Sequence, residues 1–155
     1  MNKFAVPILA AALAGCLGSA PKAPVYWTID VDSDAKALFV SVCAPYGGQR
    51  IAVLRPDGSI AFDPCNSFAA SPSGILKDAL VARGGKGSLL VRRLALDCRT
   101  AGQRDALVEL EVVVGDKSSR GAASVPTHDG NFSAAFSSAF SRAYAQAQEG
   151  LKPGQ

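Results

Sequence analysis

Few side chains in this sequence are arranged as catalytic groups usually are. His128, the single histidine, precedes Asp129 as in half of a catalytic triad, but a lone histidine before a helix is more often simply solvated. Neither G-x-S-x-G nor H-E-x-x-H occurs. Gly84–Ser88 (GGKGS) faintly resembles a phosphate loop, yet Leu80 replaces its first glycine and no helix N-terminus follows it. We therefore predict that the protein is not an enzyme and holds no metal or dissociable cofactor.

Cys16 has the clearest chemical role. It follows an uncharged run of twelve residues, Phe4–Gly15, that begins directly after Lys3. This run is shorter than the roughly twenty apolar residues that a membrane-spanning helix needs. This layout is typical of a secretory signal, and its end, Leu13–Cys16 (LAGC), resembles the bacterial lipobox. In such signals the chain is cut before the cysteine, whose thiol and new amine are acylated, and several acyl chains anchor a protein stably. The alternative is a structural cysteine beside a conventional signal.

The signal sets the predicted domain organisation. Residues 1–15 form the lipoprotein signal peptide, 16–24 a lipidated tether, 25–150 a single α+β periplasmic domain and 151–155 a flexible tail. Leu17 stands where an aspartate would indicate retention in the inner membrane. We therefore expect a lipid-anchored protein on the periplasmic face of the outer membrane.

The charge balance argues against nucleic acid as a partner. After removal of the signal, fifteen basic residues face thirteen acidic ones. Binding to nucleic acid would require a clustered basic surface instead.

Three further cysteines remain in an oxidising compartment: Cys43, Cys65 and Cys98. None is spaced as C-x-x-C, so a zinc site or thioredoxin-like chemistry has little support. We expect one buried disulfide among them and one inert buried thiol, with the pairing left open.

The first half of the domain is predicted to be mainly β. Val25–Val31 and Lys36–Ala44 are rich in β-branched and aromatic residues and indicate two strands. Ile51–Leu54 and Ser59–Phe62 flank Pro56-Asp57-Gly58, which predicts a hairpin. A helix follows, with Ser71 as its N-cap, Pro72 at its first position, and Gly84-Gly85 at its end.

A second hairpin follows from two alternating segments, Ser88–Cys98 and Ala106–Val114. Matching their apolar faces sets Leu94 against Leu110 and Arg93 opposite Glu111. Arg92 then falls on the apolar side, so we expect either a bulge there or a different register. A short edge strand within 121–127, ended by Pro126, completes this part.

The last element is predicted to be a helix from Asp129 or Asn131 to Gly150. Phe132, Phe136 and Phe140 recur every four residues beside a row of alanines. We expect these phenylalanines to be buried against the domain's own sheet. The alternatives are that they line a ligand site or that a neighbouring copy of the protein covers them, which would imply a homo-oligomer. The resulting fold class is α+β, a mostly antiparallel sheet of about six to seven strands with two helices, in the order ββββαββ(β)α.

The first hairpin is also the predicted partner-binding element. Binding residues concentrate on loops held by rigid scaffolds. Arg55 and Asp57 at the turn, with Phe62 and Phe68 in the segment expected to form a loop after it, combine exposed charge with two aromatics. An ordinary hairpin end is the alternative.

Taken together, these pieces resemble the ABC-type transport auxiliary lipoproteins, which include the PqiC-like components of MCE lipid-transport systems. The resemblance rests on the lipobox, Tyr26–Asp30 (YWTID), Pro45–Phe62 (PYGGQRIAVLRPDGSIAF), Asn66–Leu80 (NSFAASPSGILKDAL) and the closing Ala/Phe-rich helix. It implies a non-catalytic auxiliary subunit on the outer membrane that works with an inner-membrane ABC permease and ATPase and an MCE-domain protein to move lipids.

Two other roles stay open at this stage. One is an assembly factor or plug for an outer-membrane barrel, similar to the lipopolysaccharide-insertion lipoprotein. The other is a structural lipoprotein of the envelope.

Overall fold

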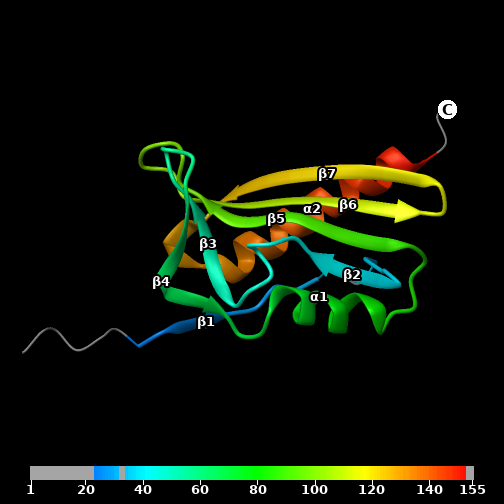
Figure 1. The fold of residues 1–155 in the computed structure, drawn as a ribbon, viewed down its shortest axis with the longest axis horizontal. Coiled ribbons are helices and arrows are strands. Elements are labelled where there is room, and N and C mark those ends of the chain that lie inside the picture. Colours follow the sequence, from blue (N-terminus) through cyan, green and yellow to red (C-terminus); the bar gives the residue numbers. More distant parts are fainter. Residues whose placement is uncertain (1–22, 32–33, 153–155) are drawn as a thin grey trace, which may run out of the picture.

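Seven strands and two helices make up the residues that the structure, a computed structural model, describes: 23–31 and 34–152. The α+β class predicted from the sequence is confirmed (Figure 1). In chain order the elements are β1 (Val25–Trp27), β2 (Phe39–Val42), β3 (Arg50–Leu54), β4 (Ile60–Phe68), α1 (Pro72–Val81), β5 (Ser88–Asp97), β6 (Asp105–Val114), β7 (Lys117–Pro126), a 3₁₀ turn (His128–Gly130) and α2 (Phe132–Leu151).

The sheet is mixed, so the prediction of a mostly antiparallel sheet was wrong. Its strands follow the order β1-β4-β3-β5-β6-β7, and β2 pairs with β5 off this path. The pairs β3–β4, β5–β6 and β6–β7 are antiparallel, whereas β1–β4, β2–β5 and β3–β5 are parallel. One edge of β5 is thus shared by two strands, with β2 beside its first half and β3 beside its end.

The two N-terminal strands are shorter than predicted because part of their backbone bonds to α2 instead of to a strand. Ser133 Oγ donates to the carbonyl of Thr28 at 2.8 Å, and the Asp30 N–H donates to Ser137 Oγ at 2.8 Å. Tyr144 Oη donates to the carbonyl of Lys36 at 2.9 Å. The segment between β1 and β2 therefore follows the helix, and β1 and β2 do not pair with each other.

Helix α1 begins as predicted. Ser71 Oγ accepts a hydrogen bond from the Gly74 N–H at 3.2 Å, and Pro72 occupies the first turn, where no N–H is needed. The helix ends at Val81, before Gly84, and buries Leu76 and Leu80. It packs against β2.

The predicted bulge at Arg92 is present, and it changes the register of the second hairpin. Val91 pairs with Leu110, while Arg93 pairs with Glu109, so one residue is added on β5 between them. The predicted pairing of Arg93 with Glu111 was therefore wrong, and Leu94 faces Val108 rather than Leu110. Because this error is two residues, Leu94 and Leu96 still point to their predicted face. Before the bulge, however, Leu89 and Val91 point to the core instead of Leu90, which alternation had assigned there.

Helix α2 covers β6 and β7, and its aromatic stripe is buried within the chain. In Figure 1 it runs behind these strands along the long axis of the domain. Asn131 caps it, with Oδ1 accepting from the Ala134 N–H at 3.1 Å, and the helix continues one residue past the predicted end, to Leu151. Its fully or nearly buried residues are Phe132, Ala135, Phe136, Ala139, Phe140, Ala143 and Ala147.

Small residues on both sides bring the helix backbone onto β7. A Cβ added at Gly121 would overlap the carbonyl oxygen of Ala143, so β7 passes directly against the alanine row. Strand β7 has ten residues instead of the short edge predicted, because it pairs with β6 along its whole length.

Candidate functional site

The turn between β3 and β4 is held rigidly by local hydrogen bonds. We call Arg55–Ser59 the hairpin tip. The Arg55 N–H donates to Ser59 O and the Gly58 N–H donates to Arg55 O, each at 3.0 Å, and Gly58 takes φ +80°. Asp57 Oδ1 accepts from Ser59 Oγ at 2.6 Å and from the Ser59 N–H at 2.9 Å, and these bonds hold the pKa of Asp57 below its usual range. Both Arg55 and Asp57 expose their side chains, as a docking element requires.

The two aromatics predicted beside the tip have different places. Phe62 is partly buried, with the Arg50 guanidinium 5.2 Å from the centre of its ring. Phe68 is only 1% exposed and packs edge-on against Phe136, with ring centroids 5.4 Å apart. Its assignment to a docking loop was therefore wrong. The physical reason is that residues 60–68 continue as one strand, which turns Phe68 into the core.

An apolar row crosses the sheet beside the hairpin tip. Phe62, Ala52, Ala95 and Leu107 are successive cross-strand partners on β4, β3, β5 and β6. They lie on the face of the sheet that points away from α2, because the alternate residues Leu94 and Val108 and their neighbours fill the helix side. We call this side of β3–β7 the open face.

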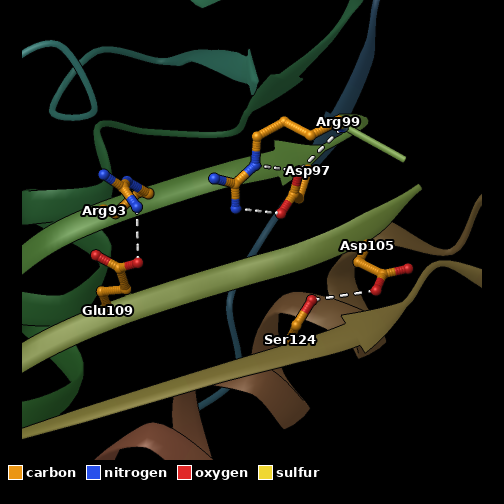
Figure 2. A network of polar contacts seen from close by, with 6 residues as sticks. All are labelled: Arg93, Asp97, Arg99, Asp105, Glu109 and Ser124. Atoms are coloured by element: carbon orange, nitrogen blue, oxygen red, sulfur yellow. Dashed lines mark hydrogen bonds and ion pairs between the residues drawn. The ribbon is translucent and has the colours of Figure 1, made fainter. Parts of the chain in front are cut away.

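Charged side chains on the same face are held by polar contacts, which Figure 2 shows as two ion pairs and one aspartate bonded to a serine. Arg93 donates to Glu109 at 2.7 Å, Arg99 Nη2 to Asp97 at 2.7 Å and Ser124 Oγ to Asp105 at 3.1 Å. The hydrogen bonds from Arg99 lower the pKa of Asp97. Such exposed pairs add little stability, but they keep the open face charged and evenly balanced.

The bulge places one more cation on this face. Arg92 Nε donates to Glu111 Oε2 at 2.8 Å, and Arg120 Nε lies 3.5 Å from the same oxygen. Hydrogen bonding from Arg92 lowers the pKa of Glu111. Arg92 thus joins the charged face instead of the core, which explains why an arginine is tolerated in an apolar run.

A buried carboxylate lies on the other side of β4 and ties three elements together. Asp63 Oδ1 accepts from the N–H groups of Cys65 and Asn66 at 2.9 Å and from Asn66 Nδ2 at 3.0 Å. Asp63 Oδ2 accepts from Arg104 at 2.6 Å, and the Arg104 guanidinium lies 4.8 Å from the ring centre of Phe132 in α2. Among the described residues, Asp63 is the charged side chain that is buried. Its two oxygens accept the four hydrogen bonds given above, so its burial leaves no polar atom unpaired.

The same network reaches β1, the first strand of the described chain. Trp27 Nε1 donates to Asn66 Oδ1 at 2.9 Å, and the Trp27 ring lies 5.3 Å from that of Phe132. Strand β1 is therefore fixed to β4 and to α2 by specific side-chain contacts. Sequence reasoning missed this network, although the pattern Asp63-Pro64 followed by Asn66 within a strand is turn chemistry that could have drawn attention to it.

The three cysteines of the domain are all free and only partly buried, so the predicted disulfide is not formed. Cys43 follows β2, Cys65 lies in β4 and Cys98 follows β5, and these are separate strands of the sheet. Burial raises the pKa of the Cys98 thiol, which disfavours the reactive thiolate. Cys16, the predicted lipidation site, lies outside the described residues.

Within 23–31 and 34–152, no three His, Cys, Asp or Glu side chains are grouped as metal ligands would be. His128 lies in the 3₁₀ turn before α2 and is exposed. None of the helices in this part of the chain has the length and apolar character that a membrane span needs.

Comparison with known proteins gives a likeness of fold. No family model matches the sequence, and no curated protein does. Among solved structures, protein XCC0632 from Xanthomonas campestris, described as a DUF330 protein, matches with a TM-score of 0.52 and 19% identity over 80% of this chain and 87% of its own. A second structure, of an uncharacterized protein, matches with a TM-score of 0.50 and 11% identity over 83% of this chain and 94% of its own. At these identities the likeness concerns the fold alone.

Proposed function

We propose that this protein is a lipid-anchored lipoprotein on the periplasmic face of the outer membrane and a non-catalytic docking subunit of an ABC/MCE-type lipid-transport system. The observation that carries this proposal is the rigid hairpin tip, whose exposed Arg55 and Asp57 border the open face of the sheet. A surface held in one conformation loses little entropy when a partner binds. The lipobox-like Leu13–Cys16 supplies the anchor, nine residues before β1.

The arrangement near the tether supports an anchored role. Strand β1 has only three residues and lies at the edge of the sheet, so backbone pairing alone would hold it weakly. The bond from Trp27 to Asn66 and the Asp63–Arg104 pair behind it fix this strand to the domain. A lipid anchor joined to the domain through β1 would therefore connect to a strand that specific side-chain contacts hold to β4 and α2.

The anchor is tested by Cys16→Ser. Without the thiol no acyl chain can be attached, and a single domain without one has no stable hold on a bilayer. We expect the variant to leave the outer-membrane fraction after a high-salt wash or to remain as an uncleaved precursor. The measurement is membrane fractionation with immunoblotting. Outer-membrane fractionation like that of the unmodified protein would show that Cys16 is no anchor.

The docking surface is tested by Arg55→Glu. Reversing an exposed charge at a binding surface weakens association by repulsion without affecting the fold, since the Arg55 side chain is exposed. We expect co-purification with the MCE-domain protein and permease to fall about tenfold, while the melting temperature changes by no more than a few degrees.

Arg142→Glu is the matched control, because Arg142 is an exposed arginine on α2 away from the hairpin tip. It should leave partner recovery unchanged. Equal recovery with both variants would mean that the hairpin tip is an ordinary turn.

A further inference from the structure

An apolar and basic surface lies at the end of the sheet where β2 and β5 begin and β6 ends. We call it the distal patch. Six large apolar side chains of the described residues are exposed, and three of them gather here, interleaved with lysines. The patch consists of Leu38, Phe39 and Val114 with Lys36, Lys86 and Lys117.

Two glycines show that these residues are close in space. The Gly87 carbonyl accepts from the Leu38 N–H at 2.8 Å and the Phe39 N–H at 3.4 Å, and a Cβ added at Gly87 would come within 2.9 Å of Val114 Cγ2. A Cβ added at Gly85 would overlap the backbone where Lys36 joins Ala37. Three segments far apart in the sequence therefore meet at one end of the sheet, where the register points Leu38 and Val114 to one side of the sheet and Phe39, the partner of Ser88, to the other.

The apolar side chains of the patch are too exposed to serve the core. Leu38 is 51%, Phe39 67% and Val114 38% exposed. Isolated exposed apolar residues are normal, but a cluster of three at one end of a domain marks an interaction site.

The charge around them is mainly positive. All three lysines are exposed, and no ion pair found among the described residues includes any of them. Two exposed carboxylates lie beside them in the sequence: Asp34, two residues before Lys36, and Asp116 in the turn between β6 and β7. Arg92, Arg93 and Arg104, in contrast, are held in ion pairs on the open face and at Asp63.

This composition favours a lipid surface over a protein surface. Lysine is depleted at protein interfaces, where arginine and aromatic residues are enriched. Flexible lysine stems can instead lie along the headgroup layer while apolar side chains enter the acyl boundary, and each lysine near an anionic membrane adds to the attraction. We propose that the distal patch binds the surface of a bilayer that contains anionic phospholipid.

This contact would be separate from the lipid anchor. In Figure 1 the chain enters β1 at one end of the long axis, while the β6–β7 turn lies at the other. The inference goes beyond the proposed function and is independent of it, because the patch is tested without the anchor.

The test uses the chain from residue 16 onward with Cys16→Ser, which retains all the described residues, and measures co-sedimentation with lipid vesicles. We expect binding to vesicles of phosphatidylcholine with phosphatidylglycerol, little binding to phosphatidylcholine alone, and release at high salt. The double variant Lys86→Glu/Lys117→Glu should lower the partition coefficient more than tenfold, because each lysine removed is expected to lower it about fivefold. Phe39→Ser should lower it about tenfold.

Two matched controls keep the result specific. Lys77→Glu reverses an exposed lysine on α1, and Ile60→Ser removes an exposed apolar side chain near the hairpin tip. Both should bind vesicles as the parent chain does. Circular dichroism of each variant should show the parent spectrum, since all the substituted side chains are exposed.

Three results would overturn the proposal. The first is no binding to anionic vesicles, and the second is binding that the patch variants leave unchanged. The third is that the parent chain binds no vesicles but binds a protein partner that Phe39→Ser no longer binds. That result would assign the patch to a protein partner. None of these depends on whether Cys16 is lipidated or the hairpin tip binds a partner.

Discussion

Phe136→Ala is expected to lower the free energy of unfolding by about 3–5 kcal/mol, enough to leave much of a marginal domain unfolded at 37 °C. Phe136 is fully buried, and its ring packs edge-on against Phe68 at 5.4 Å. Removing it leaves a cavity between α2 and the sheet that the close contact at Gly121 keeps from collapsing, because the helix backbone already touches β7 there. Chemical denaturation followed by circular dichroism measures the loss.

Phe39→Ala is the matched control for this change. It removes the same atoms from a side chain that is 67% exposed, and it should alter stability by no more than about 0.5 kcal/mol. Size-exclusion chromatography adds a second readout. A Phe136→Ala variant that stays stable and folded, but loses an oligomer, would show that a neighbouring copy and not the sheet buries the stripe.

Asp63→Asn is expected to lower the free energy of unfolding by about 2–3 kcal/mol at neutral pH. The carboxylate accepts four hydrogen bonds, including one from the Arg104 guanidinium. The substituted amide has a single acceptor oxygen and two donors, so it cannot satisfy Arg104 and the Cys65–Asn66 backbone together. Trp27 is tied to the network through Asn66, so its fluorescence should report the loosening of β1.

The pH dependence provides an independent check of this prediction. Burial alone would raise the pKa of Asp63, but hydrogen bonds from Cys65 and Asn66 and the charge of Arg104 outweigh burial, and the pKa is lowered. A carboxyl group whose pKa is lower in the folded state stabilises the fold above its unfolded pKa of about 3.9 and loses that contribution in more acidic solution. The difference between parent and Asp63→Asn should therefore be greatest near neutral pH and shrink below about pH 4.

Asp116→Asn serves as the control for Asp63→Asn. It changes an exposed carboxylate in the β6–β7 turn and should alter stability by no more than about 0.5 kcal/mol at any of these pH values. If the parent and Asp63→Asn differed equally at pH 7 and pH 3, the ionised carboxylate would not be the source of the stability.

Predictions that depended on neighbours in the sequence agree with the structure. The Ser71 cap, the tight turn at Asp57-Gly58 and the buried face of α2 each follow from residues within one or two turns of the backbone. The bulge at Arg92 also belongs here, because one charged residue in an alternating run is enough to indicate it. Alternation also assigned the side chains of β6, and those of β5 after the bulge, to their faces, even though the register was two residues off. Before the bulge it assigned Leu90 to the wrong face.

Predictions that depended on distant residues could not be made from the sequence. Alternation shows which face of a strand is buried, but it does not show which strand lies beside it, so the parallel pairing of β1 with β4 and of β2 with β5 was not foreseen. Phe68 was misplaced for a related reason. An aromatic residue after Pro64 reads as part of a loop until β1 is seen to pair with the end of β4.

The sequence by itself thus determined the predicted signal with Cys16 at its end, the α+β class and the amphipathic character of each main element, since these are properties of composition and short-range periodicity. Only the tertiary structure decided that Asp63 meets Arg104 across forty-one residues and that Lys36, Lys86 and Lys117 surround one apolar patch. The physical reason is that such contacts depend on strand order and on the close backbone approaches at Gly85 and Gly87. Both are set by how the whole chain packs its core and not by any local preference.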